Sequence, residues 1–166
     1  MKKKDLKVFR SAIRSLEREI EIQLKGDTGC CGVSTAQCHI ILELNETGPM
    51  SVKEISSLFG LDKSTISRTV EGMCACGLIE RSEALDDRRR VDIALTEKGT
   101  EVALRINAAC DSYYEKIFSH IDLKKHQDVV ISLSLVADAM SRERKASGGC
   151  ACASLDISGL KNKKKE

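Results

Sequence analysis

The stretch that most constrains the fold is residues 42–96, where two short helical patterns are followed by two strand patterns. In the first pattern, Val52, Ile55 and Phe59 recur at spacings of three and four. Such spacing places all three side chains on one face of a helix, so it predicts a short helix over 52–60 with one buried side.

A second helix is expected directly after a turn. Gly60 permits the chain to leave the first helix, and Asp62 is placed to cap the next by accepting its free backbone N–H groups. The second helix is predicted from about residue 63 to residue 76, with Ile66, Val70 and Met73 on its inward face. Its outward face carries short hydroxyl and cationic side chains: Lys63, Ser64, Thr65, Ser67, Arg68 and Thr69. Such side chains hydrogen-bond base edges and phosphates in a major groove without steric bulk, so all but Thr69 are predicted DNA contacts.

The two strand patterns predict a basic hairpin. Residues 78–81 and 91–95 alternate like strands, and Asp86-Asp87-Arg88-Arg89-Arg90 lies between them. An arginine-tipped ribbon reaches into a minor groove, where narrow A·T-rich sequence concentrates negative potential. Arg88, Arg89 and Arg90 are therefore predicted DNA contacts. A polar helix face or an arginine run alone is usually only solvated surface, but their order and spacing together favour DNA binding.

Three groups of residues resemble a known family. They are Leu61 to Arg68, Gly77 to Arg81, and Asp87-Arg88-Arg89 followed by Leu95-Thr96-Glu97-Lys98-Gly99. Together they resemble the multiple antibiotic resistance regulator (MarR) family of winged-helix repressors, over roughly residues 5–145. One departure is the presence of cysteines at 74 and 76, late in the second helix, where the family usually has polar residues.

The resemblance implies a mainly α fold with a small β-hairpin wing. It implies a winged helix-turn-helix lobe, 34–96, on a helical dimerisation base, 1–33 plus 97–145. Residues 146–166 begin with a Ser- and Gly-containing linker and are predicted from their composition to be a flexible tail. The resemblance further implies a homodimer that binds an inverted-repeat operator in double-stranded DNA. In such proteins Asp87 would order the wing and Arg89 would lie on DNA.

Composition agrees with this architecture. Of 166 residues, 3% are aromatic and none is Trp, so aliphatic helix packing must supply most of the core. The net charge is only +2, so affinity for DNA must come from local basic patches. No apolar run is long enough to span a bilayer, and the basic N-terminus lacks the apolar segment of a signal peptide. These features predict a cytoplasmic protein without a membrane partner.

Three further helices are expected outside the lobe, over about 5–24, 97–120 and 123–145. The first carries an apolar seam of heptad type: Leu6, Phe9, Ile13, Leu16 and Ile20. Plain core packing would explain this seam, but the resemblance favours pairing with the last helix in a dimer base. Cys110 lies on the apolar stripe of the middle helix and is predicted to be a core residue.

Eight cysteines are unusual for a chain in a reducing compartment, where they indicate metal binding or reactive thiols before disulfides. Ser34 and Gln37 form a capping-box pattern, so Cys30, Cys31 and Cys38 are expected near a helix N-terminus. The positive end of the helix dipole favours thiolate over thiol there. Inward packing of Cys38 is the competing interpretation.

Two more sulfurs, Cys150 and Cys152, follow a glycine linker in the tail, before a lysine-rich end. Cys74 and Cys76 lie two apart on a helix and point about 200° away from each other, so they are expected to be secondary thiols at most. A set of four or five thiolates with few imidazoles favours soft ions over Mg, Ca or Mn. Arsenite, Hg, Cd, Cu(I), Zn or an iron–sulfur cluster would all suit this set.

The sequence thus predicts a homodimeric, sequence-specific transcriptional regulator, acting as a repressor and controlled by a soft metal or metalloid on Cys30, Cys31, Cys38, Cys150 and Cys152. Thiol oxidation at the same cysteines is one alternative. Release by a small aromatic inducer is another. An enzyme has little support, because neither a nucleophile motif nor a phosphate-cradling glycine loop is present.

Overall fold

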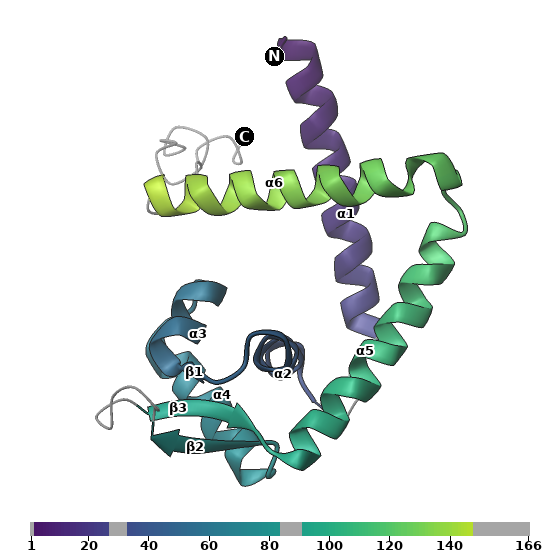
Figure 1. Cartoon of the computed structure of the whole chain (residues 1–166). Helices are drawn as coiled ribbons and strands as arrows, with labels where there is room; N and C mark the ends of the chain where they lie inside the picture. The colour runs from purple at the N-terminus through teal and green to yellow at the C-terminus, as the bar shows by residue number, and fades with distance from the viewer. Residues whose placement is uncertain (1, 27–32, 84–90, 148–166) are drawn as a thin grey trace, which may run out of the picture. The chain divides into compact units, whose positions relative to one another are not determined.

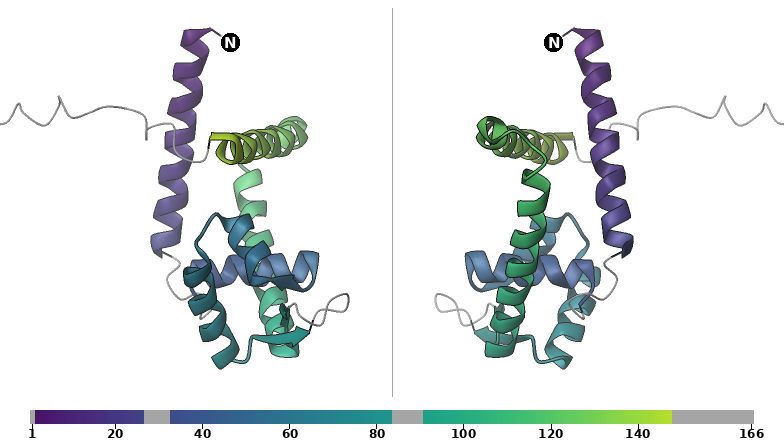
Figure 2. Two further views of the ribbon diagram at one scale, coloured as in Figure 1. Left: turned by 90° about the vertical axis from the view of Figure 1, so that its left-hand side faces the viewer. Right: turned by 90° about the vertical axis from the view of Figure 1, so that its right-hand side faces the viewer.

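The computed structural model describes residues 2–26, 33–83 and 91–147. The chain divides into two compact units, residues 1–112 and 113–166, and each is described by itself (Figures 1 and 2). The observed fold is mostly helical with a small antiparallel sheet, as the sequence predicted. The predicted limits of the lobe, the dimerisation base and the tail remain predictions.

The first unit contains the whole helix-turn-helix and wing. Its elements, in order, are α1 (Lys3–Gly26), α2 (Thr35–Thr47), β1 (Met50–Ser51), α3 (Val52–Phe59), α4 (Lys63–Ala75), β2 (Ile79–Glu83), β3 (Val91–Leu95) and most of α5 (Glu97–Phe118). The predicted short helix is α3, the predicted outward-facing polar helix is α4, and both lie where the residue patterns placed them.

Local hydrogen bonds explain where these helices begin. At α2, Ser34 N donates to Gln37 Oε1 at 2.8 Å and Gln37 N donates to Ser34 Oγ at 3.3 Å, which confirms the predicted capping box. Ser51 and Glu54 form a second capping box at α3. Gly60 has φ +64°, a left-handed conformation that lets α3 end and the chain turn into α4.

The sheet has the strand order β1-β3-β2, antiparallel throughout. Met50 pairs with Ile93 across β1 and β3, and Arg81 pairs with Ile93 across β2 and β3. The predicted hairpin is therefore confirmed, and β1 adds a third strand that the sequence did not predict. A strand of two residues is too short to show an alternating pattern.

The core of this unit is aliphatic, as the low aromatic content predicted. Twelve buried residues form one cluster: Ile40, Ile41, Leu44, Ile55, Ile66, Val70, Met73, Leu78, Ile79, Ile93, Ala103 and Ile106. They come from α2, α3, α4, α5 and both hairpin strands, so burial of this cluster fixes α4 against the sheet.

Helix α1 leaves its predicted seam open to solvent in the single chain. Leu6, Phe9, Leu16 and Ile20 are each between 42% and 46% exposed, whereas Ile13 is half-buried. Exposed apolar residues at helical spacing are typical of a surface that a partner covers.

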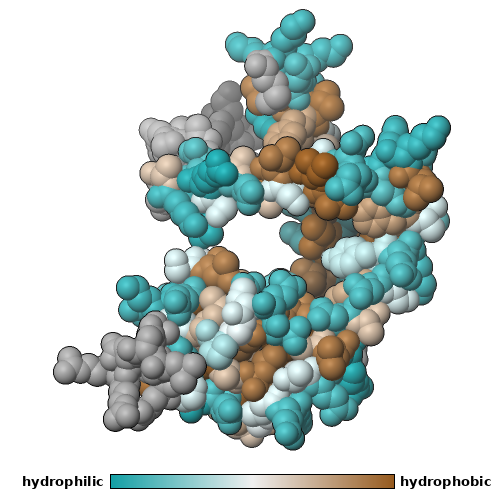
Figure 3. All heavy atoms as spheres, viewed as in Figure 1, coloured by the Kyte–Doolittle hydropathy of each residue, from teal (hydrophilic) through white to brown (hydrophobic). Residues whose placement is uncertain are grey.

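The second unit contains the end of α5, the short helix η1 (Leu123–Lys125) and α6 (His126–Ser147). His126 Nε2 lies 3.1 Å from Phe118 O and 3.0 Å from Ile121 O, so its half-buried ring ties the turn to the start of α6. Apolar side chains of α6, including Val130 and Leu133, lie on its surface among charged ones (Figure 3). Among the helices described, none is both long and apolar enough to cross a membrane.

Candidate nucleic-acid interface

Helix α4 presents a polar face while its apolar face is buried in the core. Ile66, Val70 and Met73 are at most 1% exposed, which fixes the rotation of the helix about its axis. Lys63, Ser64, Thr65 and Arg68 are exposed and Ser67 is half-buried. The structure therefore brings together the five predicted DNA contacts of this helix on its outer side.

Asp62 organises the first turn of α4. Its carboxylate accepts hydrogen bonds from Thr65 N at 2.8 Å, from Thr65 Oγ1 at 2.6 Å and from the hydroxyl of Ser64. The hydroxyls of Ser64 and Thr65, together with the backbone N–H of Thr65, hold the pKa of Asp62 well below its ordinary range. The carboxylate therefore stays anionic at physiological pH, beside side chains that were predicted to meet DNA.

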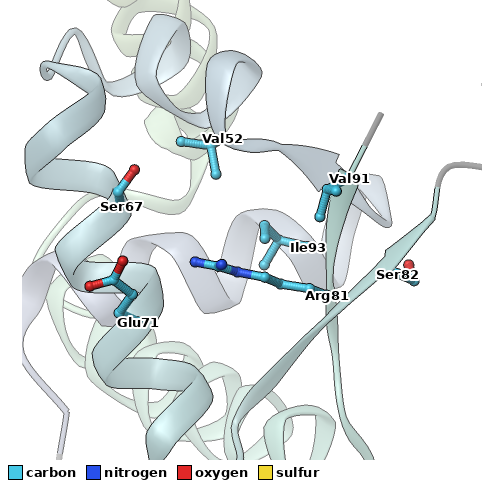
Figure 4. Close-up of a pocket in the computed structure, with 7 residues that line it drawn as sticks. All are labelled: Val52, Ser67, Glu71, Arg81, Ser82, Val91 and Ile93. Carbon is cyan, nitrogen blue, oxygen red and sulfur yellow. The ribbon is translucent and has the colours of Figure 1, made fainter. Parts of the chain in front are cut away.

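A pocket of about 530 Å³ lies between α4 and the sheet (Figure 4). Seven residues line it: Val52, Ser67, Glu71, Arg81, Ser82, Val91 and Ile93. The side chain of Arg81 extends from β2 toward Glu71 on α4, so the pocket has one cationic and one anionic wall. No role could be predicted for either residue from the sequence, because β2 and α4 meet here only in the folded chain.

A cluster of hydrogen bonds joins the end of α4 to the start of α5. Thr96 Oγ1 donates to Gly77 O at 2.7 Å and accepts from Gly99 N at 3.0 Å, while Thr96 N donates to Leu78 O at 3.1 Å. Lys98 Nζ donates to Cys76 O at 2.8 Å. The turn that follows α4 is thereby fixed to the helix that leaves the lobe.

The remaining predicted site residues are only partly placed. Asp87, Arg88, Arg89 and Arg90, like Cys30, Cys31, Cys150 and Cys152, lie outside the described residues. Three cysteines are half-buried and pack against the core cluster: Cys38, Cys74 and Cys110. This agrees with the prediction that Cys110 is a core residue. Cys76 is exposed. Within the part of the chain that the structure describes, no group of three or more His, Cys, Asp or Glu residues could hold a metal ion.

The known proteins that resemble this chain are transcriptional regulators. Residues 32–90 match the family model described as "MarR family". The chain is 28% identical over 81 residues to the HTH-type transcriptional regulator PapX of Escherichia coli, covering 49% of each protein. It is also 28% identical over 101 residues to the HTH-type transcriptional regulator BilQ of Clostridioides difficile, covering 59% of this chain and 66% of that one. The chain is therefore similar, over part of its length, to the MarR family and to HTH-type transcriptional regulators.

The similarity extends to the fold. A crystal structure of a MarR transcriptional regulator from Methanosarcina mazei Go1 superposes with a TM-score of 0.69, covering 82% of this chain and 98% of that one at 21% identity. In this winged-helix fold, α3 and α4 are the helix-turn-helix and β2 and β3 are the strands of the wing. The chain spans about half the length of PapX and 66% of the length of BilQ.

Proposed function

We propose that this chain is a transcriptional regulator of the MarR family. It binds double-stranded DNA as a homodimer at an inverted-repeat operator. It acts as a repressor and resides in the cytoplasm. The observation that carries the proposal is the polar outer face of α4, with Lys63 and Arg68 exposed on a helix whose rotation is fixed by burial. A helix presented in this way fits a major groove. The exposed apolar seam of α1 supports the homodimer, because a second copy would cover it.

The DNA contact is tested by selection from random duplexes followed by measurement of affinity. We expect an inverted repeat with half-sites about one helical turn apart, since two α4 helices related by a two-fold axis would enter successive major grooves. Arg68→Ala should weaken binding to the selected duplex by about 1–3 kcal/mol, because a guanidinium that pairs with a guanine is lost. Fluorescence anisotropy at fixed salt measures the change.

The matched control is Arg105→Ala, which removes the same charge from an exposed position on α5. It should leave affinity for the duplex unchanged apart from a small effect of net charge. Equal losses in the two variants would show that α4 does not read the DNA and would contradict the proposal.

Control by a soft metal or metalloid is the second part of the proposal. Five cysteine sulfurs at 30, 31, 38, 150 and 152 form a donor set that suits arsenite, Hg, Cd, Cu(I) or Zn better than hard ions. Cys38 lies in the second turn of α2, and α2 packs against α4. A Cβ built on Gly72 of α4 would lie 3.9 Å from Nε2 of Gln37, the residue before Cys38, so the two helices run close together here. A ligand that shifts this end of α2 would therefore act on α4 through a direct contact.

Metal control predicts a thiol-dependent loss of DNA binding. Titration of the anaerobic protein with arsenite, Cd, Hg, Zn and Cu(I) should weaken operator binding roughly 5- to 150-fold, the range of a typical allosteric coupling. Replacing Cys30, Cys31, Cys38, Cys150 or Cys152 singly with Ser should reduce that response. Cys76→Ser, at the exposed end of α4, is the control and should respond like the wild type.

Two results would overturn metal control. One is an unchanged response in all five Ser variants. The other is a wild type that responds to peroxide and to none of the ions, which would assign the same cysteines to thiol oxidation.

A further inference from the structure

The hydroxyl groups on the first turn of α4 already donate hydrogen bonds within the protein. Ser64 Oγ donates to Asp62 Oδ1, and Thr65 Oγ1 donates to Asp62 Oδ2 at 2.6 Å. Farther along the helix, Thr69 Oγ1 donates to Thr65 O at 3.0 Å. A hydroxyl has a single proton and two lone pairs, so each of these oxygens can offer DNA only an acceptor.

These hydrogen bonds are strong because their acceptor, the Asp62 carboxylate, is an anion. Hydrogen bonds from hydroxyls to a carboxylate are shorter and roughly twice as strong as neutral ones. Asp62 also caps the helix by accepting from Thr65 N, so its carboxylate cannot turn away without losing the cap. The two hydroxyls are therefore expected to keep their orientation when DNA displaces water from this exposed turn.

A surface of this kind discriminates among bases. In the major groove the only hydrogen-bond donors are the N6 amino group of adenine and the N4 amino group of cytosine. Guanine O6 and N7, thymine O4 and phosphate oxygens are acceptors, which the anionic carboxylate repels. We infer that Ser64 and Thr65 make the first turn of α4 a reader of amino bases, requiring adenine or cytosine on the strand they face and thymine or guanine opposite.

The inference rests on the proposed DNA binding and specifies its operator. The cations nearby have the complementary preference, because Arg68 and Lys63 carry only donors. Arg68 suits guanine N7 and O6, one turn beyond the hydroxyls, and Lys63 suits a phosphate. Each half-site should then combine an amino base with a guanine. Exchange of adenine for cytosine at the amino position should be tolerated, whereas inversion of the base pair should not.

The test substitutes every base pair of one selected half-site through all four possibilities and measures the wild-type affinity. At one or two positions, adenine and cytosine on the same strand should bind alike, and guanine and thymine should bind roughly 5- to 150-fold more weakly. Removing the amino group alone, with purine in place of adenine, should weaken binding of the wild type. That loss should be smaller in Ser64→Ala or Thr65→Val, because the acceptor is already absent.

Asp62→Asn isolates the role of the carboxylate. Asparagine remains a good cap but adds an NH₂ donor and removes the charge, which frees a hydroxyl proton for DNA. Discrimination against guanine and thymine should fall at the amino positions and stay unchanged at the other positions of the half-site. Asp122→Asn is the matched control, since Asp122 accepts from Lys124 N at the cap of η1 in the second unit.

The outcomes separate this inference from the function beneath it. If an operator is selected but no position groups adenine with cytosine, or if Asp62→Asn leaves the grouping intact, the inference is overturned and DNA binding stands. If no duplex is preferred over random sequence, the proposed function fails and the inference fails with it.

Discussion

Gly99→Ala is expected to destabilise the protein by at least about 3 kcal/mol, the upper end of ordinary overpacking. A Cβ on Gly99 would lie 1.9 Å from Leu78 O and 3.0 Å from Leu78 C. Both are backbone atoms, and Leu78 O accepts from Thr96 N while Leu78 N donates to Met73 O. The clash therefore cannot be relieved by a side-chain rotation, and it displaces the turn that joins α4 to the sheet. Urea denaturation at equilibrium measures the change as a shift in midpoint.

Gly72→Ala is the matched control, because Gly72 is also a helical glycine. The atom nearest to a Cβ added at Gly72 is Gln37 Nε2, and their separation of 3.9 Å is an ordinary van der Waals contact. Alanine in a helix interior is favoured over glycine by roughly 0.5–1 kcal/mol, so this variant should be more stable than the wild type. Similar midpoints for the two variants would contradict the packing described around Leu78.

Leu16→Glu is expected to dissociate the proposed homodimer and to reduce affinity for the selected duplex by roughly 10³-fold or more, toward the level of non-specific binding. Leu16 belongs to the α1 seam and is 42% exposed in the single chain. In a two-fold interface one substitution places two carboxylates in apolar surroundings, where an unpaired charge is strongly disfavoured. A monomer would then hold a single half-site. Sedimentation equilibrium gives the mass, and anisotropy with the selected duplex gives the affinity.

Ser11→Glu adds the same charge to an exposed polar position on α1 and should leave both mass and affinity unchanged. A Leu16→Glu protein that sediments as a dimer and binds the operator tightly would show that the α1 seam is not the dimer surface.

Local features of the fold could be predicted from the sequence. Asp62 and the capping box of Ser34 with Gln37 mark helix starts through contacts three residues apart, and Ile66, Val70 and Met73 mark a buried face by spacing alone. These signals depend on residues close together in the chain, so they can be recognised without knowledge of the tertiary structure.

Contacts between distant segments could not be predicted in this way. Lys98 Nζ meets Cys76 O across 22 residues, and Thr96 Oγ1 meets Gly77 O across 19. The family resemblance marked Thr96 and Lys98 as part of a motif but gave them no partner.

The residue pattern also predicted DNA contacts at Ser64 and Thr65, but it did not show that both hydroxyls donate hydrogen bonds to Asp62. A short hydroxyl beside an N-cap carboxylate can donate its hydrogen bond within the protein or to DNA. The sequence pattern alone does not decide between these two partners.

Sequence-specific DNA binding through α4 is the centre of the proposed function. The most direct measurement is the ratio of its affinities for the selected inverted repeat and for a scrambled duplex of the same length and composition, at one near-physiological salt concentration. Specific binding should exceed non-specific binding by roughly 10³-fold or more. Ratios near one, with both affinities falling alike as salt rises, would mean that the protein meets only phosphates and would contradict the account.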